Sequence, residues 1–207
     1  MKLSFLLNGQ PVRLDAAPDC RAVDLLRDLH VLDVKEGCGT GECGACSVLV
    51  DGAHKLSCLM LAAQLDGCAV TTAAGLGSQS APHPIQRAFA EHGAVQCGFC
   101  TPGMSVAAAA LLAENPKPGR EDIRRAISGN LCRCTGYVMI VDAVQAAAEA
   151  MCRDSGPLRE DPQALRESAQ PSRKKPQPAG KEAAPSRSAP KPLGKKAKQA
   201  SRKAGKP

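Results

Sequence analysis

The chain has 207 residues, which suffices for one ordinary domain or two small ones, and with no Trp, one Tyr and three Phe its core must be aliphatic. No apolar run approaches the roughly 18 residues that a membrane span needs, and the first residues lack the long apolar stretch and cleavage site of a secretory signal. We therefore predict a cytoplasmic protein. In that compartment thiols stay reduced, so the 11 cysteines indicate metal ligation rather than a disulfide framework.

Charge is distributed unevenly along the chain. Residues 153–207 hold 15 Lys/Arg and 5 Asp/Glu, a net charge of +10, which leaves −3 for residues 1–152 out of the total of +7. Nine of the 16 prolines lie in the same segment, which has almost no large apolar residues. Such a segment cannot offset the entropy of ordering, so we predict a disordered basic tail. Its lysine-rich end lacks interleaved aromatic residues, which argues against nucleic-acid binding by base stacking.

The first 76 residues predict a small mixed sheet covered by a helix. Segments 2–7 and 11–14 flank Asn8-Gly9, a strong hairpin signal. Residues 22–29 space their apolar positions as a short helix does, and residues 47–50 and 68–72 are typical of strands. Between the helix and the first of these strands lies a loop, 37–46, that contains four glycines and three cysteines.

Residues 77–152 predict a second, helical domain. Helices are expected over 84–92, 103–114, 120–128 and 139–152, and Pro116 and Pro118 separate the second from the third. The fold class expected from these patterns is α+β, with domains at 1–76 and 77–152 and a tail at 153–207.

The first cysteine set is Cys38, Cys43, Cys46 and Cys58, with the spacing C-x4-C-x2-C-x11-C. This start, followed by a distant fourth cysteine, is the plant-type ferredoxin arrangement for a 2Fe-2S cluster. The glycines of the loop permit positive φ and close backbone approach, so that N–H groups can be aimed at the sulfur atoms. Zinc sites usually pair C-x2-4-C knuckles, a pattern that this loop fits poorly.

The second cysteine set is Cys97 and Cys100, spaced C-x2-C, with Cys132 and Cys134, spaced C-x-C. Each pair lies just before a predicted helix, and helix N-termini suit an anionic thiolate cluster. Four cysteines in two pairs also suit an all-thiolate zinc site, so spacing alone leaves zinc as an alternative here.

Three motifs, GCGTGECGACSVLVDG, AVQCGFCTPGM and GNLCRCTGY, resemble those of the small iron–sulfur subunit of the molybdenum hydroxylases, a family that includes xanthine dehydrogenase and aldehyde oxidoreductase. The resemblance covers residues 2–150. It implies a plant-ferredoxin-like (β-grasp) N-terminal domain and a four-helix C-terminal domain, each with one 2Fe-2S cluster. The sequence departs from the pattern at Val138-Met139, where relatives often place more polar residues, and in the tail.

The resemblance further implies that the second cluster lies nearer the molybdenum cofactor and that Gln96 and the Cys134 region contact the pterin. A large partner would hold the molybdopterin and a medium-sized one the FAD, with this chain carrying electrons from the first to the second. It would do no bond chemistry itself. The alternatives are a free-standing ferredoxin-like carrier and a zinc-bound interaction protein. Cys20 and Cys68 are expected to be small core residues, with Cys152 at the end of the last helix.

Overall fold

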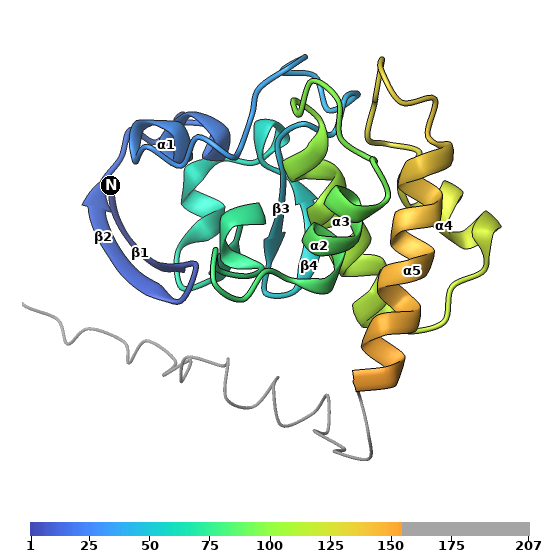
Figure 1. The fold of residues 1–207 in the computed structure, drawn as a ribbon. Helices are drawn as coiled ribbons and strands as arrows, with labels where there is room; N and C mark the ends of the chain where they lie inside the picture. Colours follow the sequence, from blue (N-terminus) through green and yellow to red (C-terminus); the bar gives the residue numbers. More distant parts are fainter. Residues whose placement is uncertain (155–207) are drawn as a thin grey trace, which may run out of the picture. The chain divides into compact units, whose positions relative to one another are not determined.

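The computed structural model describes residues 1–154, which form a five-stranded sheet with its covering helix, followed by a helical half (Figure 1). Strands β1 (Lys2–Leu7) and β2 (Gln10–Asp15) form the predicted hairpin, and both turn residues have positive φ, 50° for Asn8 and 80° for Gly9. Positive φ at both positions is what a two-residue hairpin turn of this kind requires.

The sheet has the strand order β2-β1-β5-β3-β4. Strand β5 (Ala69–Thr71) pairs parallel with β1 and antiparallel with β3 (Ser47–Val50), and β4 (Ala53–Leu56) pairs antiparallel with β3. Side chains alternate between the faces of a strand, and in β1 Leu3 and Phe5 are the buried ones. They pack with α1 (Ala22–Asp28), whose Val23 and Leu26 are fully buried.

The helical half contains α2 (Pro84–Glu91), α3 (Thr101–Glu114), α4 (Arg120–Ala126) and α5 (Val138–Asp154). Helix α3 is buried at every residue from Gly103 to Ala110, as expected of a helix that is apolar all round. The core of this half joins Phe89 of α2, Met104 of α3 and Val144 of α5. Figure 1 shows α5 beside α2 and α4, and α3 also packs on β3 of the sheet.

The predicted α+β class is confirmed, but the sequence missed strand β4 and the short 3-10 turns η1 (Ser57–Leu59), η2 (Ala62–Leu65) and η3 (Ala73–Gly75). The proposed boundaries at residues 76 and 152 stay predictions. The predicted tail lies outside the described residues, apart from its first two, which belong to α5. Within residues 1–154, no helix is both long enough and apolar enough to cross a bilayer.

Candidate metal centres

The first cysteine loop runs between α1 and β3 and is shaped by glycines in the left-handed region. Gly39, Gly41 and Gly44 have φ values of 68°, 82° and 68°, which side chains with a Cβ adopt only with strain. Space is short as well, because a Cβ on Gly41 would lie 2.4 Å from Cδ1 of Leu59. The glycines therefore let the chain wrap tightly and bring its cysteines to one place.

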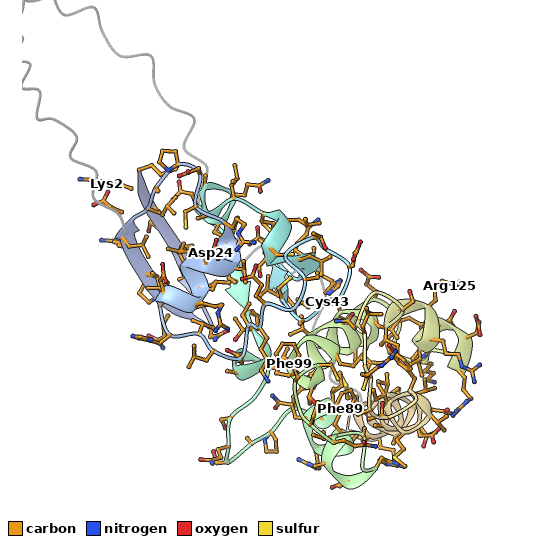
Figure 2. All side chains as sticks on the ribbon, turned by 90° about the horizontal axis from the view of Figure 1, so that it is seen from above. Lys2, Asp24, Cys43, Phe89, Phe99 and Arg125 are labelled. Carbon is orange, nitrogen blue, oxygen red and sulfur yellow. The ribbon has the colours of Figure 1, made fainter. Side chains whose placement is uncertain are left out.

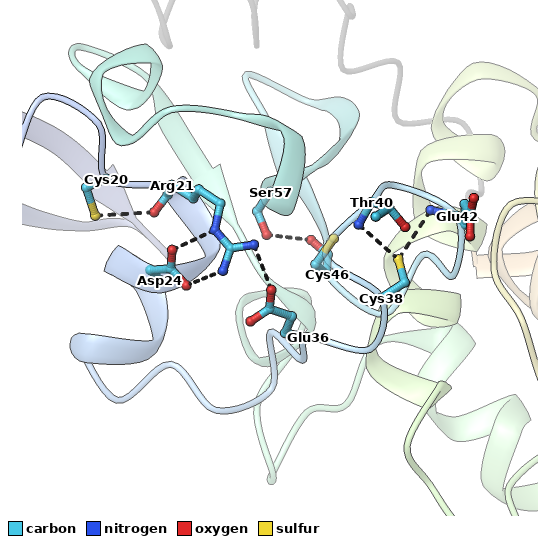
Figure 3. A network of polar contacts seen from close by, with 9 residues as sticks. All are labelled: Cys20, Arg21, Asp24, Glu36, Cys38, Thr40, Glu42, Cys46 and Ser57. Atoms are coloured by element: carbon cyan, nitrogen blue, oxygen red, sulfur yellow. Dashed lines mark hydrogen bonds and ion pairs between the residues drawn. The ribbon is translucent and has the colours of Figure 1, made fainter.

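Backbone N–H groups converge on the sulfur of Cys38. The amides of Thr40, Glu42 and Cys43 donate to its Sγ at 3.4, 3.3 and 3.4 Å (Figure 3 shows the first two). A hydrogen bond from the Thr40 side chain, together with these amides, lowers the pKa of Cys38 to about 6. The loop thus stabilises a thiolate, which is the form of cysteine that binds a metal.

Two further cysteines of the first set lie side by side in the protein interior. Cys46 and Cys58 are 2% and 4% exposed, and burial followed by a hydrogen bond with Cys46 raises the pKa of the Cys58 thiol to about 11. Ser57 holds this pair in place, because its hydroxyl donates to the carbonyl of Cys46 at 2.8 Å (Figure 3). The charge of Cys38 also raises the pKa of Cys58, so the fold brings Cys38, Cys46 and Cys58 together.

The fourth member of the first set, Cys43, lies beside the residue with which the loop begins. A Cβ on Gly37 would lie 2.9 Å from its Sγ and 3.6 Å from the ring of Phe99. Cys43 is therefore next to the start of the cysteine loop, and Phe99, which lies between the two cysteines of the C-x2-C motif, is close to the same glycine. Figure 2 labels Cys43 and Phe99 in the region where the sheet half meets the helical half.

A charged network borders the loop on its outer side. Arg21 donates to both carboxylate oxygens of Asp24, at 2.7 and 2.8 Å, and to Glu36 at 2.8 Å (Figure 3). A Cβ on Gly39 would lie 3.1 Å from the Glu36 carboxylate and 3.4 Å from the guanidinium. The network therefore ties the start of α1 to Glu36, two residues before Cys38, and lies close to Gly39.

The second cysteine set is brought together as two sulfur pairs. Cys97 is hydrogen bonded to Cys134, and Cys100 to Cys132, while Cys97 and Cys132 are close enough to interact through charge. As the sequence predicts, one pair immediately precedes α3 and the other precedes α5. Cys97 and Cys134 are exposed, and Cys100 and Cys132 are half-buried, so part of the set is accessible to solvent.

The sulfur environments within this set differ. Burial, and then its hydrogen bond to Cys132, raises the pKa of Cys100 to about 12. Burial would also raise the pKa of Cys132, but hydrogen bonds from the Thr135 side chain and nearby N–H groups outweigh it and lower that pKa to about 7. The amide of Phe99 lowers the pKa of Cys97.

Tyr137 fixes the loop that carries Cys132 and Cys134, a role that the sequence did not reveal. It is in the left-handed region, with φ of 68°, which is a genuine outlier for a bulky residue. Its hydroxyl accepts from the N–H of Cys132 at 2.8 Å and donates to the carbonyl of Asn130 at 3.4 Å. The sequence offered one clue to this role, which is that the single tyrosine of the chain closely follows Cys132 and Cys134.

The pairing of the sulfur atoms in the second set is the ligand arrangement that a 2Fe-2S cluster uses. A mononuclear zinc site of the structural type needs four ligands around one point. In a 2Fe-2S cluster each iron takes only two protein ligands, so sulfur pairs such as Cys97–Cys134 and Cys100–Cys132 are the expected unit.

The three remaining cysteines lie apart from both sets. Cys20 and Cys68 are half-buried rather than core residues; they pack against the core of the sheet half, and their thiols donate to backbone carbonyls at 3.4 Å. Cys152, on the last turns of α5, donates to the carbonyl of Pro116 at 3.4 Å.

A backbone hydrogen bond joins the two cysteine sets. The N–H of Leu131, the residue before Cys132, donates to the carbonyl of Cys43 at 2.9 Å. A path of covalent bonds and one hydrogen bond therefore runs from Cys132 to Cys43.

Comparison with known proteins agrees with this geometry. Residues 5–69 match the family of 2Fe-2S iron–sulfur cluster binding domains, and residues 72–145 match the family of 2Fe-2S binding domains. The nicotinate dehydrogenase small FeS subunit of Eubacterium barkeri is 49% identical over 148 residues, which cover 71% of this chain and 94% of that protein.

Solved structures agree as well. The crystal structure of quinoline 2-oxidoreductase from Pseudomonas putida 86 matches with a TM-score of 0.71 and 45% identity, covering 74% of this chain and 96% of that chain. Aldehyde oxidoreductase from Desulfovibrio desulfuricans matches with a TM-score of 0.71 and 42% identity, over 82% of this chain but only 18% of that longer one. The chain therefore belongs to the family of iron–sulfur small subunits of the molybdenum hydroxylases, with two 2Fe-2S domains and an electron-transfer role.

Proposed function

We propose that the chain passes electrons from a molybdopterin site on a large partner subunit to FAD on a second partner. Cys38, Cys43, Cys46 and Cys58 would hold the first 2Fe-2S cluster, and Cys97, Cys100, Cys132 and Cys134 the second. Such clusters accept and release single electrons, which divides a two-electron oxidation of substrate on the partner into two steps. The chain's own residues hold the sulfur atoms at fixed positions and tune them through N–H donors.

The observation that carries this proposal is the direct link between the two cysteine sets. Leu131, which precedes Cys132, donates its N–H to the carbonyl of Cys43 at 2.9 Å. A relay needs its two redox centres close together in one rigid frame, whereas two independent structural metal sites have no such need. The contact of α3 with β3 provides that frame, since α3 follows Cys100 and β3 follows Cys46.

Several large apolar side chains next to the cysteines of the second set in the sequence are exposed, as a permanent docking face requires. These side chains, which are 40–62% exposed and lie beside the cysteines in the sequence or at the start of α5, are Val95, Phe99, Leu131, Val138 and Met139. Large apolar side chains gathered on a surface mark an interaction site more often than chance exposure. Gln96 is exposed beside Cys97, where a pterin held by the large partner would meet it. A free-standing carrier that meets its partners only briefly has no need of this face.

A smaller apolar area borders the first set. Leu59, which lies against Gly41 of the cysteine loop, is 63% exposed, and Leu61 is 45% exposed. We assign this side to the FAD-binding partner, because Leu59 adjoins the loop of the first cysteine set, which is the set that passes electrons on in the proposed relay. The match to part of a much longer aldehyde oxidoreductase chain supports an assembly in which this fold is fixed beside other domains. Location in the cytoplasm stays a prediction.

Co-purification tests the proposal. A tagged chain expressed in its native host should bring down a large subunit that contains molybdenum and a second protein that contains flavin. Replacement of Val138 and Met139 by Glu should release the molybdenum subunit, because both side chains are exposed at the docking face. Leu32→Glu is the matched control, since Leu32 is 59% exposed but belongs to the segment after α1. Recovery of the chain with both clusters and no partner would favour the free-standing carrier.

A further inference from the structure

A buried amide side chain from the second cysteine motif reaches into the first cysteine loop. Asn130, two residues before Cys132, is 2% exposed. Its Nδ2 donates to the carbonyl of Gly44 at 3.0 Å and to Oγ of Ser47 at 3.1 Å. Gly44 follows Cys43 directly and Ser47 follows Cys46, so one side chain holds the loop next to two cysteines of the first set.

The two groups that accept hydrogen bonds from Asn130 are also hydrogen bonded to each other. The hydroxyl of Ser47 donates to the carbonyl of Gly44 at 2.7 Å, which leaves its two lone pairs for Nδ2 of Asn130 and for Nε2 of His54 at 2.8 Å. This donor count makes Nε2 the protonated nitrogen of His54, because the hydroxyl has only one hydrogen to give. His54 lies on β4 and forms the exposed end of the network.

Close backbone contacts converge on the same peptide. A Cβ on Gly44 would lie 2.4 Å from the carbonyl oxygen of Gly129 and 2.5 Å from Nδ2 of Asn130. A Cβ on Gly103, in the first turn of α3, would lie 2.4 Å from the carbonyl oxygen of Gly44. The first turn of α3, which follows Cys100, and the turn of Gly129 and Asn130, which precedes Cys132, therefore both contact the peptide that follows Cys43.

The amide side chain of Asn130 is energetically unfavourable at this buried position, which indicates a role other than filling space. Oδ1 of Asn130 is a buried side-chain oxygen for which the described part of the chain offers no hydrogen-bond partner. An unsatisfied buried acceptor is unfavourable, and an apolar side chain of the same shape would avoid that loss. An apolar side chain could not, however, hold the Gly44 carbonyl and the Ser47 hydroxyl in one orientation.

From these contacts we propose that Asn130 is a positioning residue that sets the distance and relative orientation of the two clusters. The inference rests on the proposed ligand assignment and adds a role for a residue that binds no iron. Because Asn130 acts on the loop through Nδ2, its loss should leave all eight cysteines able to bind iron but let the loop of residues 43–47 shift against the turn of residues 129–132.

The test is EPR of the dithionite-reduced holoprotein, comparing the wild type with Asn130→Ala. The magnetic interaction between two reduced clusters depends on their separation and orientation, and a purely structural side chain would not change it. We expect unchanged iron content, two cluster signals and an altered spin–spin splitting, together with a shifted midpoint potential of the first cluster. Asn115→Ala is the matched control, because Asn115 follows the last residue of α3 and its side chain accepts locally from the N–H of Lys117.

Ser47→Ala provides a second route that removes one of the two acceptors and leaves Asn130 in place. It should change the splitting in the same direction by a smaller amount, and it decides the matter if Asn130→Ala does not assemble its clusters. Wild-type splitting and potentials in Asn130→Ala, or in Ser47→Ala where only that variant assembles, would overturn the proposal even if thermal stability fell. Absence of two iron signals in the wild type would instead refute the proposed function.

Discussion

Replacement of Gly103 by Ala tests the close approach between α3 and the first cysteine loop. The new Cβ would lie 2.4 Å from the carbonyl oxygen of Gly44, whereas contacts of a Cβ below 3.0 Å essentially do not occur, so helix and loop must separate by at least 0.6 Å. Overpacking of this kind costs about 1–3 kcal/mol. Alanine gains about 1 kcal/mol over glycine inside a helix, so it offsets part of that cost.

The two terms leave a net loss of about 1 kcal/mol, which for a domain of this size lowers the apparent melting temperature by about 2–4 °C. Gly129→Ala is the control, because that position has no positive φ and nothing within 4 Å of a new Cβ. Thermal melting followed by the visible absorbance of the clusters measures both variants. If Gly103→Ala melted at or above the wild-type temperature, as helix propensity alone predicts, the contact between Gly103 and the Gly44 peptide would not be as tight as described.

Three further predictions follow from the sites. Cys43→Ser should abolish one of the two EPR signals and spare the other, and loss of neither would remove Cys43 from the ligand set. Tyr137→Phe should shift the potential of the second cluster alone, because the hydroxyl that accepts from the N–H of Cys132 is lost; an unchanged potential in a redox titration would contradict this. The Nδ1 atom of His83 accepts from the N–H of Ile85 at 3.2 Å and caps α2, and burial lowers the pKa of His83. The cap is therefore present above the ordinary histidine pKa of about 6.5 and is lost as the pH falls through the lowered pKa of the folded state. Its loss, of about 1 kcal/mol, should appear in acid melts of the wild type and be reduced in His83→Asn, which keeps an acceptor without titrating; equal acid sensitivity of the two would refute the cap.

The cysteine motifs could be located from the sequence because ligands of one loop must be close along the chain. The spacing of Cys38, Cys43 and Cys46 and the glycines among them already specify a tight loop, and the structure has one there. The pairing within the second set is different, since Cys97 with Cys134 and Cys100 with Cys132 depend on how α3 and α5 begin relative to each other. That information lies in the packing of the helical core and not in any local pattern.

The contact between the two cysteine sites could not be predicted from the sequence for the same reason. Asn130 and Gly44 are 86 residues apart, and nothing in the local sequence distinguishes Asn130 from an ordinary loop asparagine.

Strand β4 was missed because of its local sequence. Its residues Ala53, His54 and Lys55 are all exposed, so the strand lacks the alternation of apolar and polar residues that identifies a half-buried strand. It forms because it continues the turn at Asp51-Gly52 and pairs with β3.

The most direct test of the central claim is EPR of the dithionite-reduced full chain, with iron and zinc measured on the same sample. The account predicts two distinct S = 1/2 signals and about four irons per chain, because two 2Fe-2S clusters are held by eight cysteines. One signal, with zinc in place of the missing iron, would show that the second cysteine set is a structural zinc site and that the chain is not a two-cluster relay.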